Sequence, residues 1–244
     1  TEAFEREKNN FLSVYPNSTL RTTISNLSTN FYIESGDTEK AIEALDKSKA
    51  NTDDADVKEN NTIKIIGLKL EKKDYKDMEK YLGEISDPEE RAYYSAQYYA
   101  QKKDPKLVKE YETLLKSEKY KAYASKALGD YYFDKKDLAK SKKYYGTHVS
   151  VNKNPDEYVL YRLGQANEKE NNLKMALADY KLVYEKKGKL AEDAMLRAAE
   201  IYDRQENNVE AEKLFTKLYA TKGNKDLKAY SIEKLIYYKL LNEK

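Results

Sequence analysis

The sequence LGDYYFDKKDLAKSKKYY, residues 128–145, contains the pattern that decides the fold. Three of its features are a small residue at Gly129, a second small residue at Ser141 and a ring at Tyr145. Each returns twice at steps of 35 residues, as Gly164, Ala176 and Tyr180 and then as Ala199, Ala211 and Phe215. A fixed period of this length indicates an array of repeated supersecondary units.

Each repeat reads as two helices. In the first helix, apolar residues recur three and four positions apart, as at Leu160, Tyr161 and Leu163. A short polar break follows, and then an Asp or Asn that can cap the second helix; we place these caps at Asp37, Asp137, Asn172 and Asn208. The small residues at Gly129 and Gly164 are expected to let the paired helices approach closely.

Prolines support these boundaries. The run Asn154-Pro155-Asp156-Glu157 resembles a helix start, with Asn154 as the cap and Pro155 as the first helical residue. Asp87-Pro88 and Asp104-Pro105 read in the same way, whereas Pro16 marks the end of a helix.

The whole chain is therefore expected to be one all-α array, residues 1–244. We divide it into a leading half repeat (1–16), repeats at about 19–51, 57–85, 88–119, 120–153, 155–188 and 191–223, and a closing helix (226–242). The apolar face of the half repeat, at residues 4–15, would be exposed without an upstream partner helix. We therefore expect the array to be a fragment of a longer chain.

The composition fits a thin fold. Only 40% of the 244 residues are hydrophobic, 24 of them being tyrosines, and 36% are charged. Tyrosine can pack its ring while its hydroxyl stays near water. Basic and acidic residues are interspersed, with a net charge of +2, so no basic stripe points to nucleic acid. No apolar run approaches the roughly 20 residues that a membrane-spanning helix needs, so direct membrane insertion is not expected.

Leu128-Gly129, Tyr132, Ser141 and Tyr145 resemble the signature of the tetratricopeptide repeat (TPR) family. The resemblance is strong over residues 120–223 and weak over 57–119; Asn167 departs from it, because the family usually has Tyr there. It implies a right-handed α-solenoid of about six helix-turn-helix repeats plus the leading half repeat and the closing helix. It also implies a concave groove lined by first helices, where a protein or peptide would bind. The groove residues expected from it are Tyr123, Lys126, Asp130, Phe133, Tyr158, Tyr161, Arg162, Gln165, Lys169, Arg197, Glu200, Asp203 and Arg204.

The segment Phe11-Leu12-Ser13-Val14-Tyr15-Pro16-Asn17-Ser18 is similar to repeat ends of bacterial envelope TPR proteins. Two such proteins are the periplasmic coordinator of the Tol-Pal system and the lipoprotein of the barrel-assembly machinery. The similarity favours a location in the bacterial cell envelope, in the periplasm, with the cytoplasm as the alternative.

No residue set indicates catalysis, a metal site or a cofactor. The chain has no cysteine, and its single histidine, His148, is expected to serve packing or to be exposed. The acidic cluster at Asp53, Asp54, Asp56 and Glu59 lacks the spacing of a calcium loop and is better explained as a linker that caps the next helix. A clamp for a partner's C-terminal carboxylate is not expected, because the acid Asp130 stands where the family needs Asn.

Three functions remain open. The first is a non-catalytic protein-interaction scaffold. The second is a structural spacer or oligomerisation module of a larger envelope protein, and the third is an enzyme whose activity resides in a lost N-terminal domain. Nothing within these residues supports the third. The sequence also leaves open that the groove residues are solvated helix faces whose charges pair with their neighbours.

Overall fold

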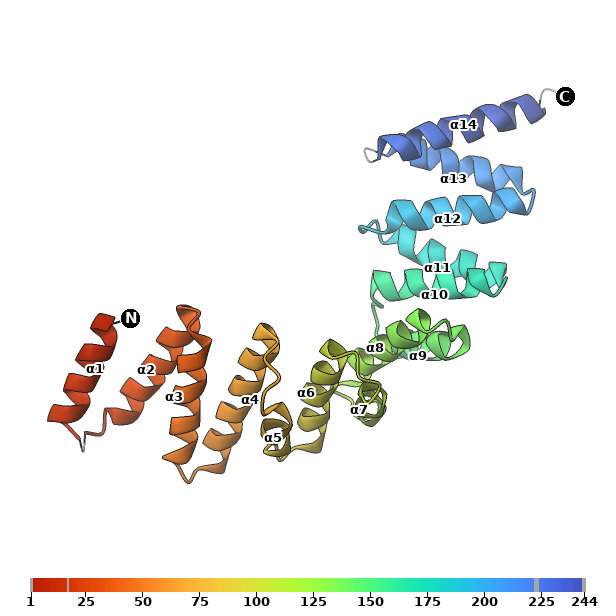
Figure 1. Ribbon diagram of the computed structural model, residues 1–244. Helices are drawn as coiled ribbons and strands as arrows, with labels where there is room; N and C mark the ends of the chain where they lie inside the picture. The colour runs from red at the N-terminus through yellow and green to blue at the C-terminus, as the bar shows by residue number, and fades with distance from the viewer. Residues whose placement is uncertain (1, 17, 222–223, 243–244) are drawn as a thin grey trace. The chain divides into compact units, whose positions relative to one another are not determined.

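The computed structural model describes residues 2–16, 18–221 and 224–242, and within these ranges it contains fourteen α-helices and no strand (Figure 1). Thr1, Asn17 and Gly223, which fall within predicted features, lie outside the described residues. Consecutive helices pack in adjacent pairs, so the all-α, TPR-like fold is confirmed. The chain divides into two compact units, Thr1–Thr113 and Leu114–Lys244.

The N-terminal unit contains short and long helices around one core. Its helices are α1 (Glu2–Val14), α2 (Arg21–Glu34), α3 (Thr38–Ala50), α4 (Ala55–Lys72), α5 (Met78–Gly83), α6 (Pro88–Gln101) and α7 (Leu107–Leu114, whose last residue begins the other unit). The core lies among α3, α4, α5 and α6 and includes the fully buried Ile65, Ile66 and Ile85. Helix α1 contributes no buried residue to it.

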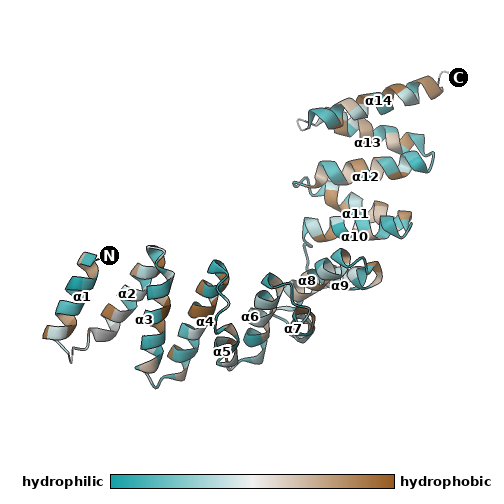
Figure 2. Ribbon diagram, in the orientation of Figure 1, coloured by the Kyte–Doolittle hydropathy of each residue, from teal (hydrophilic) through white to brown (hydrophobic). Residues whose placement is uncertain are grey.

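The C-terminal unit is more regular. Its helices are α8 (Lys121–Asp134), α9 (Leu138–Val151), α10 (Glu157–Lys169), α11 (Leu173–Glu185), α12 (Ala191–Arg204), α13 (Asn208–Ala220) and α14 (Lys225–Asn242). Each helix packs on the next along the chain. Hydrophobic residues cover only part of each helix (Figure 2), as expected where every pair buries one side against its neighbours.

Glycines stand where paired helices cross. A Cβ atom at Gly129 would lie 2.4 Å from Cδ1 of Tyr145, and one at Gly164 would lie 2.8 Å from Cε1 of Tyr180. The hydroxyl of Ser141 donates a hydrogen bond of 3.0 Å to the carbonyl oxygen of Gly129. The expected role of these glycines in close helix approach is therefore confirmed.

The caps agree with expectation at some positions and differ at others. Asp37 and Asp137 accept hydrogen bonds from the backbone N–H groups of Lys40 and Lys140, and Asp87 caps α6 with Pro88 in its first turn. Asn172 occupies a cap position, but its side chain makes no capping bond.

Three predicted helix starts are wrong. Helix α7 begins at Leu107, so Pro105 precedes it instead of opening it. Asn207, rather than Asn208, caps α13, because its side chain accepts from the N–H of Glu210. Asp156, rather than Asn154, caps α10 by accepting from the N–H of Tyr158, so Pro155 precedes the helix instead of opening it.

One crossing position carries a different pair of side chains in each of three helix pairs. Tyr132 and Tyr144 stack with ring centroids 5.6 Å apart. At the positions 35 residues on, the amide of Asn167 donates a hydrogen bond of 2.8 Å to the carboxylate of Asp179. A further 35 residues on, these positions hold Tyr202 and Leu214. The departure at Asn167 is thus matched by a second departure across the helix crossing.

Candidate protein-binding surface

The thirteen groove residues expected from the sequence all lie on the first helices of three successive pairs, α8, α10 and α12. We call them the first-helix band. Phe133 is buried, while the other members are half-buried or exposed. The band is continuous because side chains from each helix reach those of its predecessor.

Helices α8 and α10 are joined through Arg162. Its guanidinium lies 4.5 Å from the ring centroid of Phe133 and 5.1 Å from that of Tyr158. Its Nε donates a hydrogen bond of 2.9 Å to the Tyr158 hydroxyl, and Nη1 donates to Oε1 of Gln165 at 3.3 Å. The ammonium of Lys169 lies 4.8 Å from the same Phe133 ring. Cation–π contacts of this kind fix the direction of both cations.

A second contact between these helices involves Lys126. Its ammonium pairs with the Asp130 carboxylate at 3.2 Å and lies 4.6 Å from the ring centroid of Tyr158. Asp130 also accepts a hydrogen bond of 2.6 Å from the hydroxyl of Tyr145 on α9. Burial, together with this negative neighbour, raises the pKa of the Tyr145 hydroxyl. Asp130 is therefore held by its own helix pair.

Helices α10 and α12 are joined through Glu168, which the sequence did not single out. Its carboxylate accepts 2.8 Å and 2.7 Å hydrogen bonds from the Tyr180 hydroxyl and from Nη2 of Arg204. Arg197 lies 4.0 Å from both Glu168 and Glu200. The 35-residue spacing to Asp203 is the signal that could have identified Glu168.

The α8–α10 and α10–α12 junctions have the same arrangement of side chains. Arg162 and Lys169 reach back to Phe133, and the residues 35 positions on, Arg197 and Arg204, reach back to Glu168. Two cations thus hold either a ring or a carboxylate of the preceding first helix.

The arrangement differs between α12 and α14. Here the Lys234 ammonium donates a hydrogen bond of 2.7 Å to the Asp203 carboxylate, and the Tyr238 hydroxyl donates one of 2.5 Å. Partial burial alone would raise the pKa of Asp203, but these two hydrogen bonds hold it below its ordinary value.

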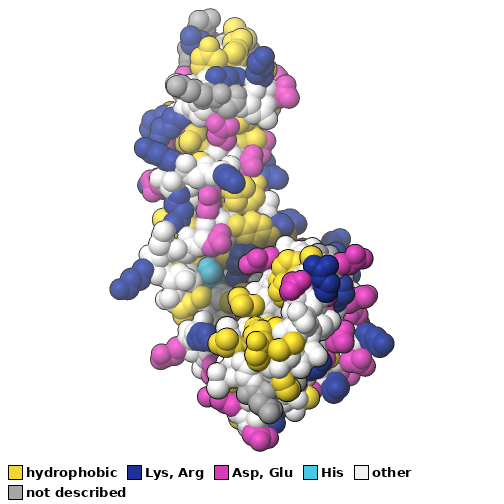
Figure 3. All heavy atoms as spheres, turned by 90° about the vertical axis from the view of Figure 1, so that its left-hand side faces the viewer, with side chains coloured by type: hydrophobic (Ala, Val, Ile, Leu, Met, Phe, Trp, Pro, Cys, Tyr) yellow, Lys and Arg dark blue, Asp and Glu magenta, His cyan; other side chains and the backbone are white. Residues whose placement is uncertain are grey.

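The face drawn in Figure 3 shows no large area of one charge among the described residues. Figure 3 shows basic and acidic side chains interspersed on the face toward the viewer. Within the band itself, the side chains of Arg204 and Arg197 are 56% and 45% exposed. Tyr123 is 38% exposed, and the ring of half-buried Tyr161 lies 5.7 Å from that of Tyr180.

A hollow of about 1040 Å³ lies between two second helices, α11 and α13, and not on the band. Tyr184 and Lys181 line it from α11, Leu214 and Lys217 from α13, and Met195 of α12 also lines it. Sequence reasoning placed no functional residue there, because it assigned second helices to packing.

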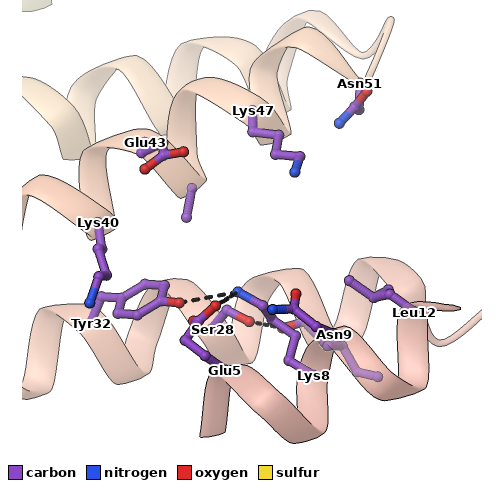
Figure 4. A pocket seen from close by; sticks show the side chains of 12 residues that line it. Glu5, Lys8, Asn9, Leu12, Ser28, Tyr32, Lys40, Glu43, Lys47 and Asn51 are labelled. Atoms are coloured by element: carbon purple, nitrogen blue, oxygen red, sulfur yellow. Dashed lines mark hydrogen bonds and ion pairs between the residues drawn. The ribbon is translucent and has the colours of Figure 1, made fainter. Parts of the chain in front are cut away.

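The N-terminal unit has a smaller hollow, of about 330 Å³, bordered by α1, α2 and α3 (Figure 4). Lys8 projects into it. Its ammonium donates a hydrogen bond of 3.1 Å to the Tyr32 hydroxyl and pairs with the Glu5 carboxylate at 2.8 Å. Lys40 pairs with Asp37 at 3.0 Å. Because two of its three lysines are already paired with acids, this hollow offers a mixed polar surface rather than an anion site.

The remaining candidates have structural explanations. His148 is buried, and its Nδ1 lies 2.8 Å from the carbonyl oxygen of Ala122. Asp54 caps α4, and Glu59 accepts a 2.9 Å hydrogen bond from the N–H of Ser86. In the described part of the chain, no three His, Cys, Asp or Glu side chains gather as metal ligands would, and no helix is long and apolar enough to cross a membrane.

The chain matches no protein-family model and no curated protein sequence. Among solved structures it resembles one described as the functional characterization of Pseudomonas aeruginosa pilF, with a TM-score of 0.57 and 16% identity over 95% of this chain and 99% of that one. It also matches the C-terminal part of a TPR repeat-containing protein from Cytophaga hutchinsonii, with a TM-score of 0.47 and 17% identity over 85% of this chain and 98% of that one. These neighbours are TPR-repeat proteins. The packing of consecutive helices in adjacent pairs, together with the likeness to the first of these two structures, shows that the chain has a TPR-like fold of stacked helix pairs.

Proposed function

We propose that this chain is a non-catalytic protein-interaction scaffold that binds a protein or peptide along the first-helix band. The observation that carries the proposal is the repeated junction in which two cations of one first helix are held against the preceding one. A surface whose aromatic and arginine side chains are already fixed loses little conformational entropy when a partner binds. Tyrosine and arginine are also the residues that most often dominate binding energy.

The band residues divide by role in this proposal. Three residues support the surface, because the Arg162 guanidinium contacts the Phe133 ring and donates to the Tyr158 hydroxyl. Tyr123, Tyr161, Lys169, Arg197 and Arg204 would contact the partner, with Lys126, Asp130, Gln165, Glu200 and Asp203 between them.

The second candidate is a structural spacer or oligomerisation module. It is favoured by the number of band charges that already have partners inside the chain, as at Asp130 and Arg204. Charges that are already paired contribute less binding energy to a partner protein. A location in the bacterial envelope, suggested by the resemblance of the Phe11–Ser18 segment, belongs to the same set of proposals.

An affinity-capture experiment with matched variants separates the two. The chain would be immobilised as wild type, as a band variant (Tyr123→Ala with Arg197→Ala) and as a control (Met175→Ala with Leu182→Ala). The control side chains lie on α11 and are 58% and 50% exposed. Captured proteins would be identified by mass spectrometry and then titrated in purified form.

The scaffold proposal expects a partner whose affinity falls about tenfold or more in the band variant and is unchanged in the control. Equal affinity for all three proteins would contradict the band assignment. Absence of any captured partner would favour the spacer.

A further inference from the structure

Helix α14 carries a stripe of large apolar side chains that no described residue covers. Ile232, Ile236, Tyr237, Leu240 and Leu241 are between 38% and 57% exposed. Three of them are spaced four apart, so they lie on one side of the helix. On the other side of the helix, Ser231 and Tyr238 are buried against the rest of the C-terminal unit.

The 35-residue register shows what is unusual about this face. In α12, Ala194, Ala198 and Ile201 are 0%, 1% and 0% exposed. The residues 35 positions on are Ala229, Glu233 and Ile236, and all three are exposed. Helix α14 therefore presents to solvent the face that the preceding first helix buries.

The cause is a missing neighbour. Helix α12 packs against both α11 and α13, whereas α14 packs against α13 and meets α12 through the contacts of Lys234 and Tyr238 with Asp203. The solvent-exposed faces of repeat arrays are ordinarily polar, which keeps the arrays soluble. The outer face of α14 is instead apolar, so another helix could pack on it.

The charges beside the stripe indicate which helix fits. At 3.6 residues per turn, Lys228 and Lys239 fall along one edge of the stripe, and Asp226 and Glu233 fall along the other, while Lys225 lies in line with the stripe at its N-terminal end. If two copies of α14 pair in parallel about a twofold axis, the basic edge of each faces the acidic edge of the other. An antiparallel pair would place lysines opposite lysines. A second copy in parallel orientation thus satisfies both the apolar stripe and its charged edges.

We propose that α14 is a self-association surface that pairs in parallel with α14 of a second copy, through a seam of Ala229, Ile232, Ile236 and Leu240. Lys228 of each copy lies opposite Glu233 of the other. One helix face is smaller than the roughly 800 Å² per partner of a standard interface, so the dimer is weak and concentration-dependent, with a dissociation constant in the micromolar range or above. The surface is separate from the first-helix band.

Sedimentation equilibrium tests the association. The wild-type chain should change from monomer to dimer as its concentration rises. Ile236→Glu should weaken dimerisation about tenfold or more, because it places a charge in the apolar seam. The matched control is Leu182→Glu on α11, where Leu182 is 50% exposed against 54% for Ile236, and it should dimerise like the wild type. Circular dichroism checks that both variants fold. A wild type that stays monomeric, or an Ile236→Glu variant that dimerises normally, would overturn the proposal.

Disulfide trapping tests the orientation. The natural chain has no cysteine, so one introduced cysteine reports on a single contact. A parallel pair brings residue 229 of one copy beside residue 229 of the other, and Ala229→Cys should form a covalent dimer under mild oxidation. In an antiparallel pair centred on the stripe, the two cysteines would be roughly 16 Å apart, too far for a disulfide. Absence of the covalent dimer at concentrations where the wild type associates would overturn the parallel arrangement.

A charge exchange gives a second measure of orientation. Lys228→Glu alone should weaken the dimer, and adding Glu233→Lys should restore it. Strengthening by Lys228→Glu alone would contradict the proposal, because it would mean that lysines face each other across the seam.

Discussion

Gly129 and Gly146 lie on the two helices of one pair, but their surroundings differ. A methyl group at Gly129 would meet the Tyr145 ring at 2.4 Å, and that ring is anchored by its hydrogen bond to Asp130. A methyl group at Gly146 would have no neighbour within 4 Å. The same substitution therefore tests packing at one site and backbone propensity at the other.

We expect Gly129→Ala to lower the free energy of unfolding by about 1–3 kcal/mol through overpacking. Gly146→Ala should raise it by up to about 1 kcal/mol, because alanine is the better helix former. Urea denaturation of both variants measures the difference. Equal effects would mean that the helix crossing at Gly129 can open without cost.

Asp179 is a buried acid with a single described hydrogen-bond donor, Asn167. Burial raises its pKa to about 6 from the ordinary 3.8, although the hydrogen bond acts in the opposite direction. Between these two values the folded chain holds a proton that the unfolded chain has released. The contribution of Asp179 to the free energy of unfolding is therefore greatest below the ordinary pKa and is lost as the pH rises through about 6.

Asp179→Asn should remove this dependence, since an amide cannot ionise and can still accept from Asn167. We expect the variant to gain stability relative to wild type as the pH rises from about 4 to about 7 and to keep a constant advantage above that range. Parallel urea titrations at several pH values give the difference directly. A pH-independent difference would show that Asp179 titrates normally in the folded chain.

At the scale of helices, different pairs of side chains occupy the same crossing position in successive repeats. The position filled by Asn167 and Asp179 is filled by Tyr202 and Leu214 in the next pair. Transplanting the second pair gives the double variant Asn167→Tyr with Asp179→Leu. Either single variant leaves one polar partner buried without its hydrogen bond, at a cost of about 1–3 kcal/mol.

The double variant should be at least as stable as wild type at neutral pH, so the two substitutions should couple favourably. A double-mutant cycle measures this coupling. Additive losses would show that the surroundings of the crossing, and not the pair itself, decide which residues fit there.

The 35-residue period allowed the helix pairs to be deduced, because it marks small residues and rings at fixed positions. The period itself places the cap of α13 at Asn207, because Asp137, Asn172 and Asn207 are 35 residues apart, whereas the predicted Asn208 lies one position off that register. The cap of α10 was misplaced because Pro155 suits the first helical position so well. For the band, the pattern gives the side of each helix but not its neighbours, so Arg162 and Arg197 could not be assigned to the junctions that they form.

At the scale of the whole chain, stability is expected to differ between helices. Helix α1 has no buried residue, and its main described contact is the stacking of Phe4 on Phe31 at 4.5 Å. Helices α9 to α13 each bury several side chains.

We therefore expect amide hydrogen exchange to be fastest in α1 and slowest in α9 to α13, because exchange follows local opening. Mass-spectrometric detection after proteolysis would resolve the helices. Protection of α1 equal to that of α12 would mean that α1 is held by contacts beyond those described.

The varied chemistry at one crossing position also affects how the chain avoids misfolding. Tandem repeats can exchange partners with a neighbour, since each helix resembles the helix 35 residues away. If α8 paired with α11, Tyr132 would meet Asp179, and that buried carboxylate would lose its amide donor. A stacked ring pair, an amide–carboxylate pair and a tyrosine–leucine pair thus label successive repeats, so that each helix distinguishes its own partner from a near copy.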